Sequence, residues 1–406
     1  MAVYLLATLD TKGPDAQFVQ HRLRELDVDV RLVDVGCLGE ATVEPAVGRD
    51  AVFAAAGTSL AALRQAGDRG AAVAAAARGA AQLVRDAWRR GEVDGVLALG
   101  GSAGTTIGTA AMRTLPIGVP KVMVSTLASG QTRPYVGDKD ILMLNSVVDI
   151  AGLNRLSRRI LSEAAAAMAG LVRFAAPPLP QADRPLIAAT MFGVTTPCVQ
   201  QARARLEAAG YEVLVFHATG NGGQAMESLI EDGLIAGVLD ITTTELADEL
   251  VGGVLSAGPS RLTAAGRCGV PQVVSVGALD MVNFGPRETV PEKFRDRRFH
   301  VHNPTVTLMR TTPEENAQLG RELATKVAAA RGPATILLPL RGVSAIDKPG
   351  QSFDDPAARE SLFSAIRAWH GAAPLVELDQ HINDEPFAAA AAETLLKLIA
   401  QTQAAR

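Results

Sequence analysis

Glycine and hydroxyl residues near position 100 form the first segment of the sequence that could do chemistry. Gly100, Gly101, Ser102, Gly104 and Thr105 follow an apolar run and lead into a helical pattern. Glycines at such a place let backbone N–H groups converge on an anion, and the start of the helix adds partial positive charge. The segment is neither a P-loop, because no Lys-Ser or Lys-Thr pair follows the last glycine, nor a GxGxxG fingerprint. We interpret it as a phosphate site, with an ordinary strand-to-helix turn as the alternative.

Two further loops of the first half carry polar residues after apolar runs. Asp10 could hold Mg²⁺ directly or through water, and Lys12 could meet a phosphate, although both residue types are also common in helix caps and turns. A later loop adds the hydroxyl and glycine residues Thr126, Ser129 and Gly130. Ligands of an open parallel sheet bind outside the carboxyl ends of its strands. We therefore expect the three loops to line one pocket.

The second half contains acidic and imidazole groups in comparable places. His217 precedes a glycine-rich stretch, residues 218–224, which predicts a second backbone anion site with an imidazole at its rim. Asp240 and Glu245 flank three threonines in the next such segment. There, a capping box in which Thr242 pairs with Glu245 is the favoured interpretation, and it does not exclude a ligand.

Histidines of the second half could supply acid–base or metal chemistry. His217 and His302 are candidate general acids or bases, because imidazole titrates near neutral pH. His300 and His302 could face the same side of an extended segment. A metal there would need further ligands. The favoured alternative is that both are structural histidines held by hydrogen bonds. The nearby acidic candidates for such ligands, and for catalysis, are Asp240, Glu245 and Asp280.

The elements that must position these residues alternate in type along the chain. Short β-branched runs alternate with Ala- and Leu-rich amphipathic segments, which is the pattern of parallel sheets wrapped by helices. In the first half the predicted strands span residues 3–8, 28–35, 93–99, 121–126 and 141–145. In the second half they span residues 186–191, 212–217, 235–241, 272–276 and 334–338. We therefore predict an α/β fold of two tandem Rossmann-like, open parallel-sheet domains.

A proline-rich stretch, FAAPPLPQADRP, separates the two halves. We predict a nucleotide-binding domain over residues 1–176, a linker over 177–185 and a second, substrate or partner domain over 186–406. The halves also resemble each other, since GVLALGGSAGT aligns with GVLDITTTE and GVPKVMVST with GVPQVVSVG. The offset between matched segments falls along the chain, so we expect an insertion around residues 37–80. Duplication and the general likeness of βαβ units account for the resemblance equally well.

Composition excludes several classes of protein. The chain has 406 residues, 48% of them hydrophobic, which excludes a mainly disordered state. Lys and Arg number 39 against 43 Asp and Glu, a net charge of −4, and aromatic residues make up only 4%, so we expect no general nucleic-acid binding. The 3 cysteines form no disulfide or metal pattern, and no apolar run is long enough to span a membrane. We therefore expect a cytoplasmic location and no membrane association.

Several motifs together resemble a known family. The segments GGSAGT, LPIGVPKVMVSTLASGQTRPYVGDKDI and NSVVDIAGLN, with HATGNGG, LDITTTEL and HNPTVTLMRTT in the second half, are similar to the Tm-one-like ATP-binding family of the tomato tobamovirus-resistance protein and its bacterial relatives. The resemblance covers essentially the whole chain. It implies two Rossmann-like domains, ATP with Mg²⁺ on the first domain, and a homodimer. The nucleotide-binding candidates that it implies are Gly100, Gly101, Ser102, Gly104, Thr105, Thr126, Ser129, Gly130, Asp10 and Lys12, with Asp10 as the Mg²⁺ ligand.

The antiviral activity of the plant protein is not expected to transfer, because it depends on a surface fitted to one viral protein. The plant protein continues into a barrel domain, so a function that needs the barrel would require a separate barrel-domain partner. Three functions stay open. The first is an ATP- and Mg²⁺-binding enzyme of small-molecule metabolism, with a small anionic substrate in a cleft between the domains. The second is a regulatory or scaffold protein whose ATP-stabilised dimer binds a partner chain, and the third is a nucleotide-independent hydrolase or carbon–carbon lyase in the second domain.

Overall fold

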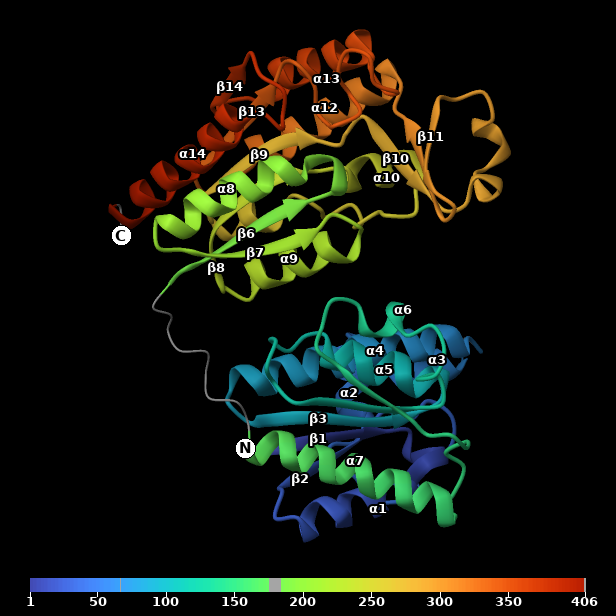
Figure 1. Ribbon diagram of the computed structural model, residues 1–406. Helices are drawn as coiled ribbons and strands as arrows, with labels where there is room; N and C mark the ends of the chain where they lie inside the picture. The colour runs from blue at the N-terminus through green and yellow to red at the C-terminus, as the bar shows by residue number, and fades with distance from the viewer. Residues whose placement is uncertain (66, 175–183, 405–406) are drawn as a thin grey trace. The chain divides into compact units, whose positions relative to one another are not determined.

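A computed structural model gives the fold of the chain, and it describes residues 1–65, 67–174 and 184–404 (Figure 1). The chain forms two compact units, residues 1–180 and 181–406. Each unit has helices on both faces of an open parallel sheet, which confirms the predicted α/β class. Of the predicted linker, residues 177–183 lie outside the described residues. None of the helices in the described ranges combines the length and the apolar character that crossing a bilayer requires.

The first unit contains a five-stranded parallel sheet in the order β2-β1-β3-β4-β5. Its strands are β1 (Ala2–Ala7), β2 (Val30–Asp34), β3 (Val93–Gly100), β4 (Lys121–Ser125) and β5 (Leu142–Asn145). All five predicted strands of this half are therefore present, with ends shifted by two residues or fewer. The order reverses direction between β1 and β3, which places a switch point, the usual ligand position in doubly wound folds, at the carboxyl ends of these two strands.

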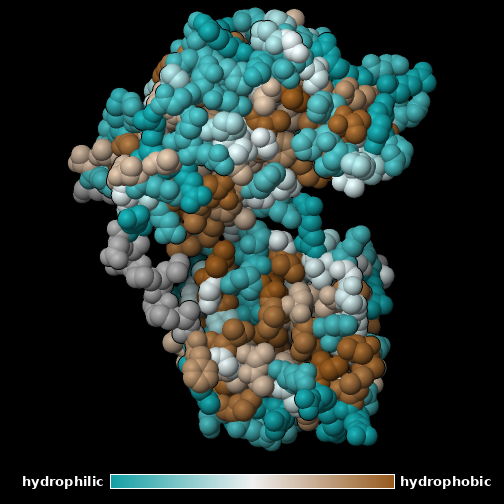
Figure 2. All heavy atoms as spheres, in the orientation of Figure 1, coloured by the Kyte–Doolittle hydropathy of each residue, from teal (hydrophilic) through white to brown (hydrophobic). Residues whose placement is uncertain are grey.

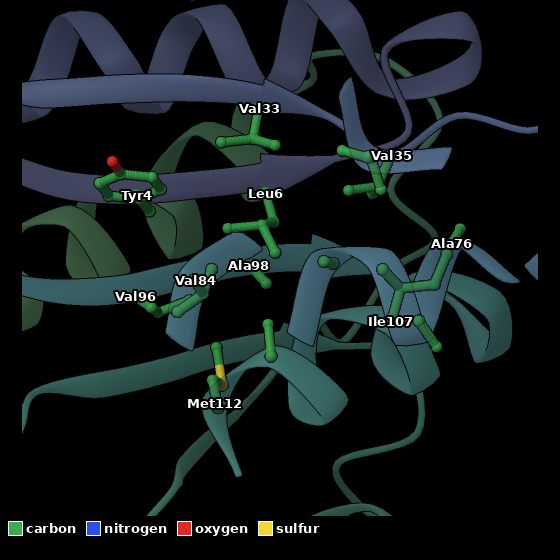
Figure 3. Close-up of a cluster of buried hydrophobic side chains, with 14 of the residues drawn as sticks. Tyr4, Leu6, Val33, Val35, Ala76, Val84, Val96, Ala98, Ile107 and Met112 are labelled. Carbon is green, nitrogen blue, oxygen red and sulfur yellow. The ribbon is translucent and has the colours of Figure 1, made fainter. Parts of the chain in front are cut away.

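Helices cover both faces of this first sheet. α1 (Leu9–Glu25) and α7 (Arg155–Arg173) pack on one face, and α4 (Arg69–Arg89) and α5 (Ser102–Met112) pack on the other. Strand residues alternate between the two cores, so that Leu6 and Ala98 face Ile107 and Met112 of α5 (Figure 3). Small residues allow this close packing, because a Cβ atom at Gly108 would lie 2.5 Å from the Ala98 side chain. The alanine and glycine excess of the sequence therefore serves helix-on-sheet packing in this unit.

The expected insertion in the first half is present between β2 and β3. It contains α2 (Arg49–Ala55), α3 (Leu60–Gln65) and the long helix α4, whereas the corresponding connection of the second unit holds a single helix, α9 (Asn221–Glu231). A short helix, α6 (Arg133–Val136), lies between β4 and β5. The insertion therefore adds helices to the connection that follows the carboxyl end of β2.

The second unit repeats the strand order of the first. Its six-stranded parallel sheet has the order β14-β13-β9-β8-β6-β7, with strands β6 (Leu186–Met191), β7 (Glu212–His217), β8 (Ile235–Thr242), β9 (Gln272–Gly277), β13 (Ala334–Pro339) and β14 (Leu375–Leu378). Strands β7-β6-β8-β9-β13 match β2-β1-β3-β4-β5 in order and direction. The five strands predicted for this half are all present, and β14 was missed.

Helices cover both faces of the second sheet as well. α8 (Thr196–Ala208) and α14 (Glu385–Ala404) pack on one face. The other face carries α9, α10 (Glu245–Val251), α11 (Ala264–Cys268), α12 (Pro313–Ala328) and α13 (Pro356–Trp369). Three short 3₁₀ helices, η1 (Gly193–Thr195), η2 (Arg287–Thr289) and η3 (Glu292–Phe294), lie in the connections.

A three-stranded antiparallel sheet extends from the second unit. It consists of β10 (Met281–Phe284), β11 (Phe299–Asn303) and β12 (Val306–Arg310), in the order β10-β12-β11. The sequence predicted only an extended segment around residues 300–304. The pairing of β11 with β12 is irregular between Val301 and Asn303, so the strict alternation that would place His300 and His302 on one face is interrupted.

Candidate functional site

A pocket of about 240 Å³ lies at the switch point of the first unit. Residues that follow β1, β2 and β3 line it, together with the start of α4. Among the predicted site residues, the lining includes Asp10, Lys12, Gly101, Ser102 and Gly104. The structure thus brings two of the three predicted loops to one pocket.

The glycine turn after β3 places the start of α5 at this pocket. A Cβ atom at Gly100 would lie 2.5 Å from the Gly104 Cα atom, and one at Gly104 would lie 2.8 Å from the Leu99 carbonyl oxygen. Both glycines are therefore needed for the turn itself. Gly101 differs, because the nearest atom to a Cβ there would be Thr126 Oγ1 at 3.6 Å, an ordinary contact.

The first turn of α5 offers backbone N–H groups to the pocket. Gly101 is the N-cap residue, and among the described residues no side-chain hydrogen bond caps this helix start. The first N–H groups of a helix have no intrahelical partner, and the helix dipole makes this end partially positive. Ser102 and Gly104, in this first turn, line the pocket. The arrangement suits a phosphate or carboxylate group.

Lys12 supplies a positive charge beside this helix start. Its backbone leaves the helical conformation at φ −129°, and its Nζ atom donates to the Ile150 carbonyl oxygen at 2.5 Å. Asp15, one turn further along α1, is fully buried, and its Oδ1 atom has no partner in the described structure. Burial raises the pKa of Asp15, and the nearby ammonium group of Lys12 partly opposes that rise.

Asp10 holds the loop after β2. Its Oδ2 atom accepts hydrogen bonds from the backbone N–H groups of Leu38 and Gly39 at 2.8 and 3.2 Å, and its Oδ1 atom has a long contact of 3.4 Å to Thr11 Oγ1. Mg²⁺ often binds through one carboxylate, several waters and the phosphates of a ligand. The free side of Oδ1 fits that pattern, although the described residues include no group of three His, Cys, Asp or Glu side chains that could hold a metal by themselves.

The other predicted nucleotide residues lie outside the pocket lining. Thr105 is buried, and its Oγ1 atom shares a hydrogen bond with Ser125 Oγ at 2.7 Å, so its side chain braces β4 against α5. Thr126 lies beside Gly101. Ser129 and Gly130 are exposed in the turn after β4.

The pocket also contains residues that sequence reasoning missed. Cys37, Leu38, Arg69 and Val73 line it, and all four belong to the β2 loop or to the insertion. Arg69 is exposed, opens α4 and forms no ion pair within the described part of the chain. Arginine at a helix start gives no usable sequence signal by itself, because α2, α6 and α7 also begin with an arginine. Burial, with the charge of Asp10, raises the pKa of Cys37 to about 11, so this thiol is neutral at pH 7.

Arg261 is buried among three carboxylates in the second unit. Its Nη1 and Nη2 atoms donate to the two oxygens of Asp240 at 2.6 and 2.7 Å, and its Nε atom donates to Glu245 Oε2 at 2.6 Å. Glu227 lies 3.4 Å from Nη1. Burial raises the pKa of Glu245, and the charge of Arg261 opposes the rise. The two acids predicted for catalysis here, Asp240 and Glu245, are thus members of a buried ion-pair network.

The backbone anion site predicted after β7 is filled by the chain itself. The N–H groups of Gly220 and Gly223, at the start of α9, donate to Glu245 Oε1 at 2.7 and 3.1 Å. The predicted capping box between Thr242 and Glu245 is therefore wrong. Glu245 reaches across to α9, and Thr242 Oγ1 instead shares a hydrogen bond with Thr195 Oγ1 at 2.8 Å.

Asp280 follows β9 and is fully buried. Its Oδ2 atom accepts a hydrogen bond from Ser344 Oγ at 2.8 Å, and its Oδ1 atom has no partner in the described structure. Burial raises the pKa of Asp280 to about 7, and the charge of Asp347 adds to the rise while Arg310 opposes it.

Within the described residues, the predicted histidines share no hydrogen bond or ion pair with these acids. His217 is exposed at the end of β7, where its ring meets Phe192 edge-on at 5.3 Å. His302 is exposed at the irregular part of β11, and the neighbouring His300 contacts Ser352 Oγ at 3.2 Å through Nδ1. Among the described residues, neither imidazole belongs to a group of three side chains that could hold a metal ion.

The fold and the pocket define a protein of two Rossmann-like α/β units, with an open helix start at the switch point of the first. Residues 1–177 match the N-terminal domain of the Uncharacterised protein family (UPF0261), and residues 184–399 match its C-terminal domain. The chain therefore belongs to the UPF0261 family.

Relatives from bacteria and from tomato support this assignment. A UPF0261 protein of Clostridium tetani (strain Massachusetts / E88) is 50% identical over 399 residues, 98% of each chain. A UPF0261 protein of Rhizobium meliloti (strain 1021) is 47% identical over 392 residues, 96% of this chain and 97% of the relative. The ToMV resistance protein Tm-1(GCR237) of Solanum lycopersicum is 47% identical over 311 residues, 75% of this chain and 41% of its own length. The predicted resemblance to the tomato protein and its bacterial relatives is thereby confirmed.

Proposed function

We propose that the first unit binds ATP with Mg²⁺ through its switch-point pocket, and that the chain is an enzyme of small-molecule metabolism acting on a small anionic substrate. The observation that carries the proposal is the open start of α5. Its N–H groups donate to no capping side chain among the described residues, and they face a pocket that Lys12 and Arg69 also line. Two cations and a helix start are the groups that bind phosphates in doubly wound folds.

The second unit supports the same assignment by contrast. Glu245 accepts the N–H groups at the start of α9, and Asn383 Oδ1 accepts the Cys198 N–H group at the start of α8 at 3.4 Å. Both helix starts are therefore satisfied by the chain's own side chains. An external phosphate would have to displace them, so we assign nucleotide binding to the first unit.

Mg²⁺ would reach the same pocket beside Asp10. When bound, the ion neutralises phosphate charge and takes most of its ligands from water and phosphate oxygens. Asp10 Oδ1 is the oxygen of this chain placed to receive it, since Oδ2 is occupied by the loop after β2. The fit rests on one carboxylate and on the phosphates that would accompany the ion.

The test is calorimetric titration with ATP in the presence and absence of Mg²⁺. Arg69→Met should weaken ATP binding about tenfold or more, because a hydrogen bond to a charged group is worth about 1.5–3 kcal/mol. Arg89→Met is the matched control, since Arg89 is an exposed arginine at the other end of the same helix. Absence of ATP binding to the wild-type protein, or equal affinity of the two variants, would refute the proposal.

One observation favours a second candidate, a regulatory or scaffold protein in which ATP only stabilises the fold. The acids of the second unit that could act in catalysis, Asp240, Glu245 and Asp280, are all buried, and the first two are ion-paired. Under this candidate, ATP binds and raises the unfolding temperature of the first unit, but no turnover occurs with any substrate. If the wild-type protein hydrolyses ATP faster than the Arg69→Met variant does, the enzyme is favoured over the scaffold protein.

A further inference from the structure

The pocket of the first unit has walls of two different kinds. The α5 start and Lys12 form a polar wall at the ends of β3 and β1. Leu38 and Val73, from the β2 loop and α4, form an apolar wall, and Ile107 of α5 adds a third apolar contact. A free inorganic anion would use only the first wall, whereas an organic phosphate would also place its carbon skeleton against the second.

Leu38 is placed unusually for an apolar side chain. It is 51% exposed, yet it lines the pocket. Exposed apolar side chains are not rare in this unit, and Figure 2 shows several apolar patches on its visible face. Leu156, for example, is 43% exposed and is not among the residues that line this pocket. The position of Leu38, rather than its exposure, is therefore what points to a ligand.

Two carboxylates hold the backbone N–H groups of the loop segment that contains Leu38. Asp34 Oδ1 accepts the Gly36 N–H group at 2.8 Å. Asp10 Oδ2 accepts the N–H groups of Leu38 and Gly39. Asp34 ends β2 and Asp10 lies in the first turn of α1, so the segment is tied to the sheet and to α1 beside the pocket.

Two arginines of the insertion donate hydrogen bonds to backbone carbonyl oxygens of the same segment. Arg49 of α2 donates to the Gly39 carbonyl oxygen and also pairs with Asp34 at 2.7 Å. Arg64 of α3 donates to the Leu38 carbonyl oxygen. Ordering a loop backbone costs roughly 1–2 kcal/mol per residue in conformational entropy. Four charged groups thus hold in one conformation a short loop whose central side chain adds little to the core.

The size of the pocket fits partial enclosure of an organic phosphate. Its volume of about 240 Å³ is below the range of about 300–1,000 Å³ that encloses a whole drug-sized ligand. A phosphate at the α5 start would leave its organic part to continue along the opening past Leu38. Rigid placement of one apolar contact there would favour ligands with a hydrophobic ring or chain next to the phosphate.

We infer that Leu38 is the specificity-determining residue of this pocket and that it selects organic phosphates, nucleotides among them, over inorganic phosphates by packing on the organic part. The inference rests on the proposed function, because it assumes that the phosphate lies at the α5 start. It also gives the insertion a role, which is to position Leu38 through Arg49 and Arg64.

The experiment compares ATP with inorganic triphosphate as ligands of the full chain, both with Mg²⁺. Leu38→Ala should weaken ATP binding about tenfold, the effect of losing most of a buried leucine contact, and leave triphosphate binding unchanged within about twofold. Leu156→Ala, the matched control, should change neither. Arg64→Met should lower ATP affinity selectively by a smaller factor, which supplies a second variant that keeps the leucine.

The outcomes separate the two proposals. If the wild-type protein binds neither ATP nor triphosphate, the proposed function fails and the inference fails with it. If the wild-type protein binds both, but Leu38→Ala weakens both by the same factor or weakens neither, the proposed function stands and the role of Leu38 is refuted.

Discussion

Gly101 and Gly104 should respond in opposite ways to the same substitution, alanine. Gly101 has φ −79° in an extended conformation, and a Cβ atom there would meet only Thr126 Oγ1 at 3.6 Å. A Cβ atom at Gly104 would lie 2.8 Å from the Leu99 carbonyl oxygen, closer than real Cβ atoms approach backbone. We therefore expect Gly101→Ala to change binding and Gly104→Ala to change stability.

The magnitudes follow from the two environments. Gly101→Ala should change the stability of the first unit by less than about 1 kcal/mol, because restriction of the unfolded chain stabilises the protein while replacement of glycine by alanine at an N-cap destabilises it. The added methyl group stands in the pocket lining and should remove one backbone hydrogen bond to a charged phosphate, worth about 1.5–3 kcal/mol. ATP affinity should thus fall roughly 10- to 100-fold. Gly104→Ala should cost about 1–3 kcal/mol through backbone displacement.

The two tryptophans make the measurement specific to one unit. Trp88 lies in α4 of the first unit and Trp369 in α13 of the second. In a Trp369→Phe background, urea unfolding followed by fluorescence reports the first unit, and calorimetry on the same proteins gives the affinity for ATP. Undiminished affinity in Gly101→Ala would refute the phosphate position at α5, and wild-type stability in Gly104→Ala would refute the turn geometry.

Three further predictions concern the second unit and the thiols. Arg261→Met should destabilise the second unit by about 3–5 kcal/mol, because it leaves buried carboxylates without a countercharge, whereas Arg267→Met at an exposed ion pair should cost less than about 1 kcal/mol in urea unfolding. Burial raises the pKa of Asp248 to about 7 from 3.8, so the folded state holds its proton more tightly than the unfolded state and stability should fall between pH 4 and 7 and level off above. Urea midpoints at pH 5 and 7.5 should show a smaller fall in Asp248→Asn than in the wild type. A thiol reagent at pH 8 should modify only the exposed Cys268 in the native protein. Burial raises the pKa values of the thiols of Cys37 and Cys198 to about 11 and 12, so rapid reaction of a second thiol per chain would contradict these values.

The parallel strands could be predicted because their sequence pattern is local. A strand buried on both faces, such as Val93–Gly100, carries an apolar run, residues 95–99, that ends in glycine, and that signal does not depend on distant residues. The antiparallel sheet was missed for the opposite reason. Strand β12 carries the buried polar residues Thr307 and Arg310, and three of the five residues of β11 are polar, so neither strand is a continuous apolar run. Arg310 is accommodated there because Asp347, 37 residues later, pairs with it and because the Phe353 carbonyl oxygen and Thr311 Oγ1 also accept hydrogen bonds from its guanidinium group.

The site was predictable to the extent that strand-end loops meet at one sheet edge. Asp10 and Gly101 were correctly expected to share a pocket, because β1 and β3 are parallel neighbours. Arg69 and Leu38 come from an insertion whose path cannot be read from local periodicity. The occupation of the α9 start by Glu245 was equally hidden, since a glutamate just after a strand is an ordinary helix-start residue and its partners are 22 and 25 residues away.

The two units therefore share one strand order but differ at the carboxyl edges of their sheets. In the first, glycines bring a helix start to an open pocket, and no side chain in the described part of the chain caps it. In the second, the carboxylate of Glu245 already occupies a helix start, and Arg261 binds its other oxygen. Displacing that carboxylate would break a buried ion pair, at a cost of several kcal/mol that a single phosphate contact does not recover. A duplicated fold that retained anion binding in both halves would leave both helix starts free. The internal carboxylate thus argues against phosphate binding at the α9 start, whatever the first unit binds.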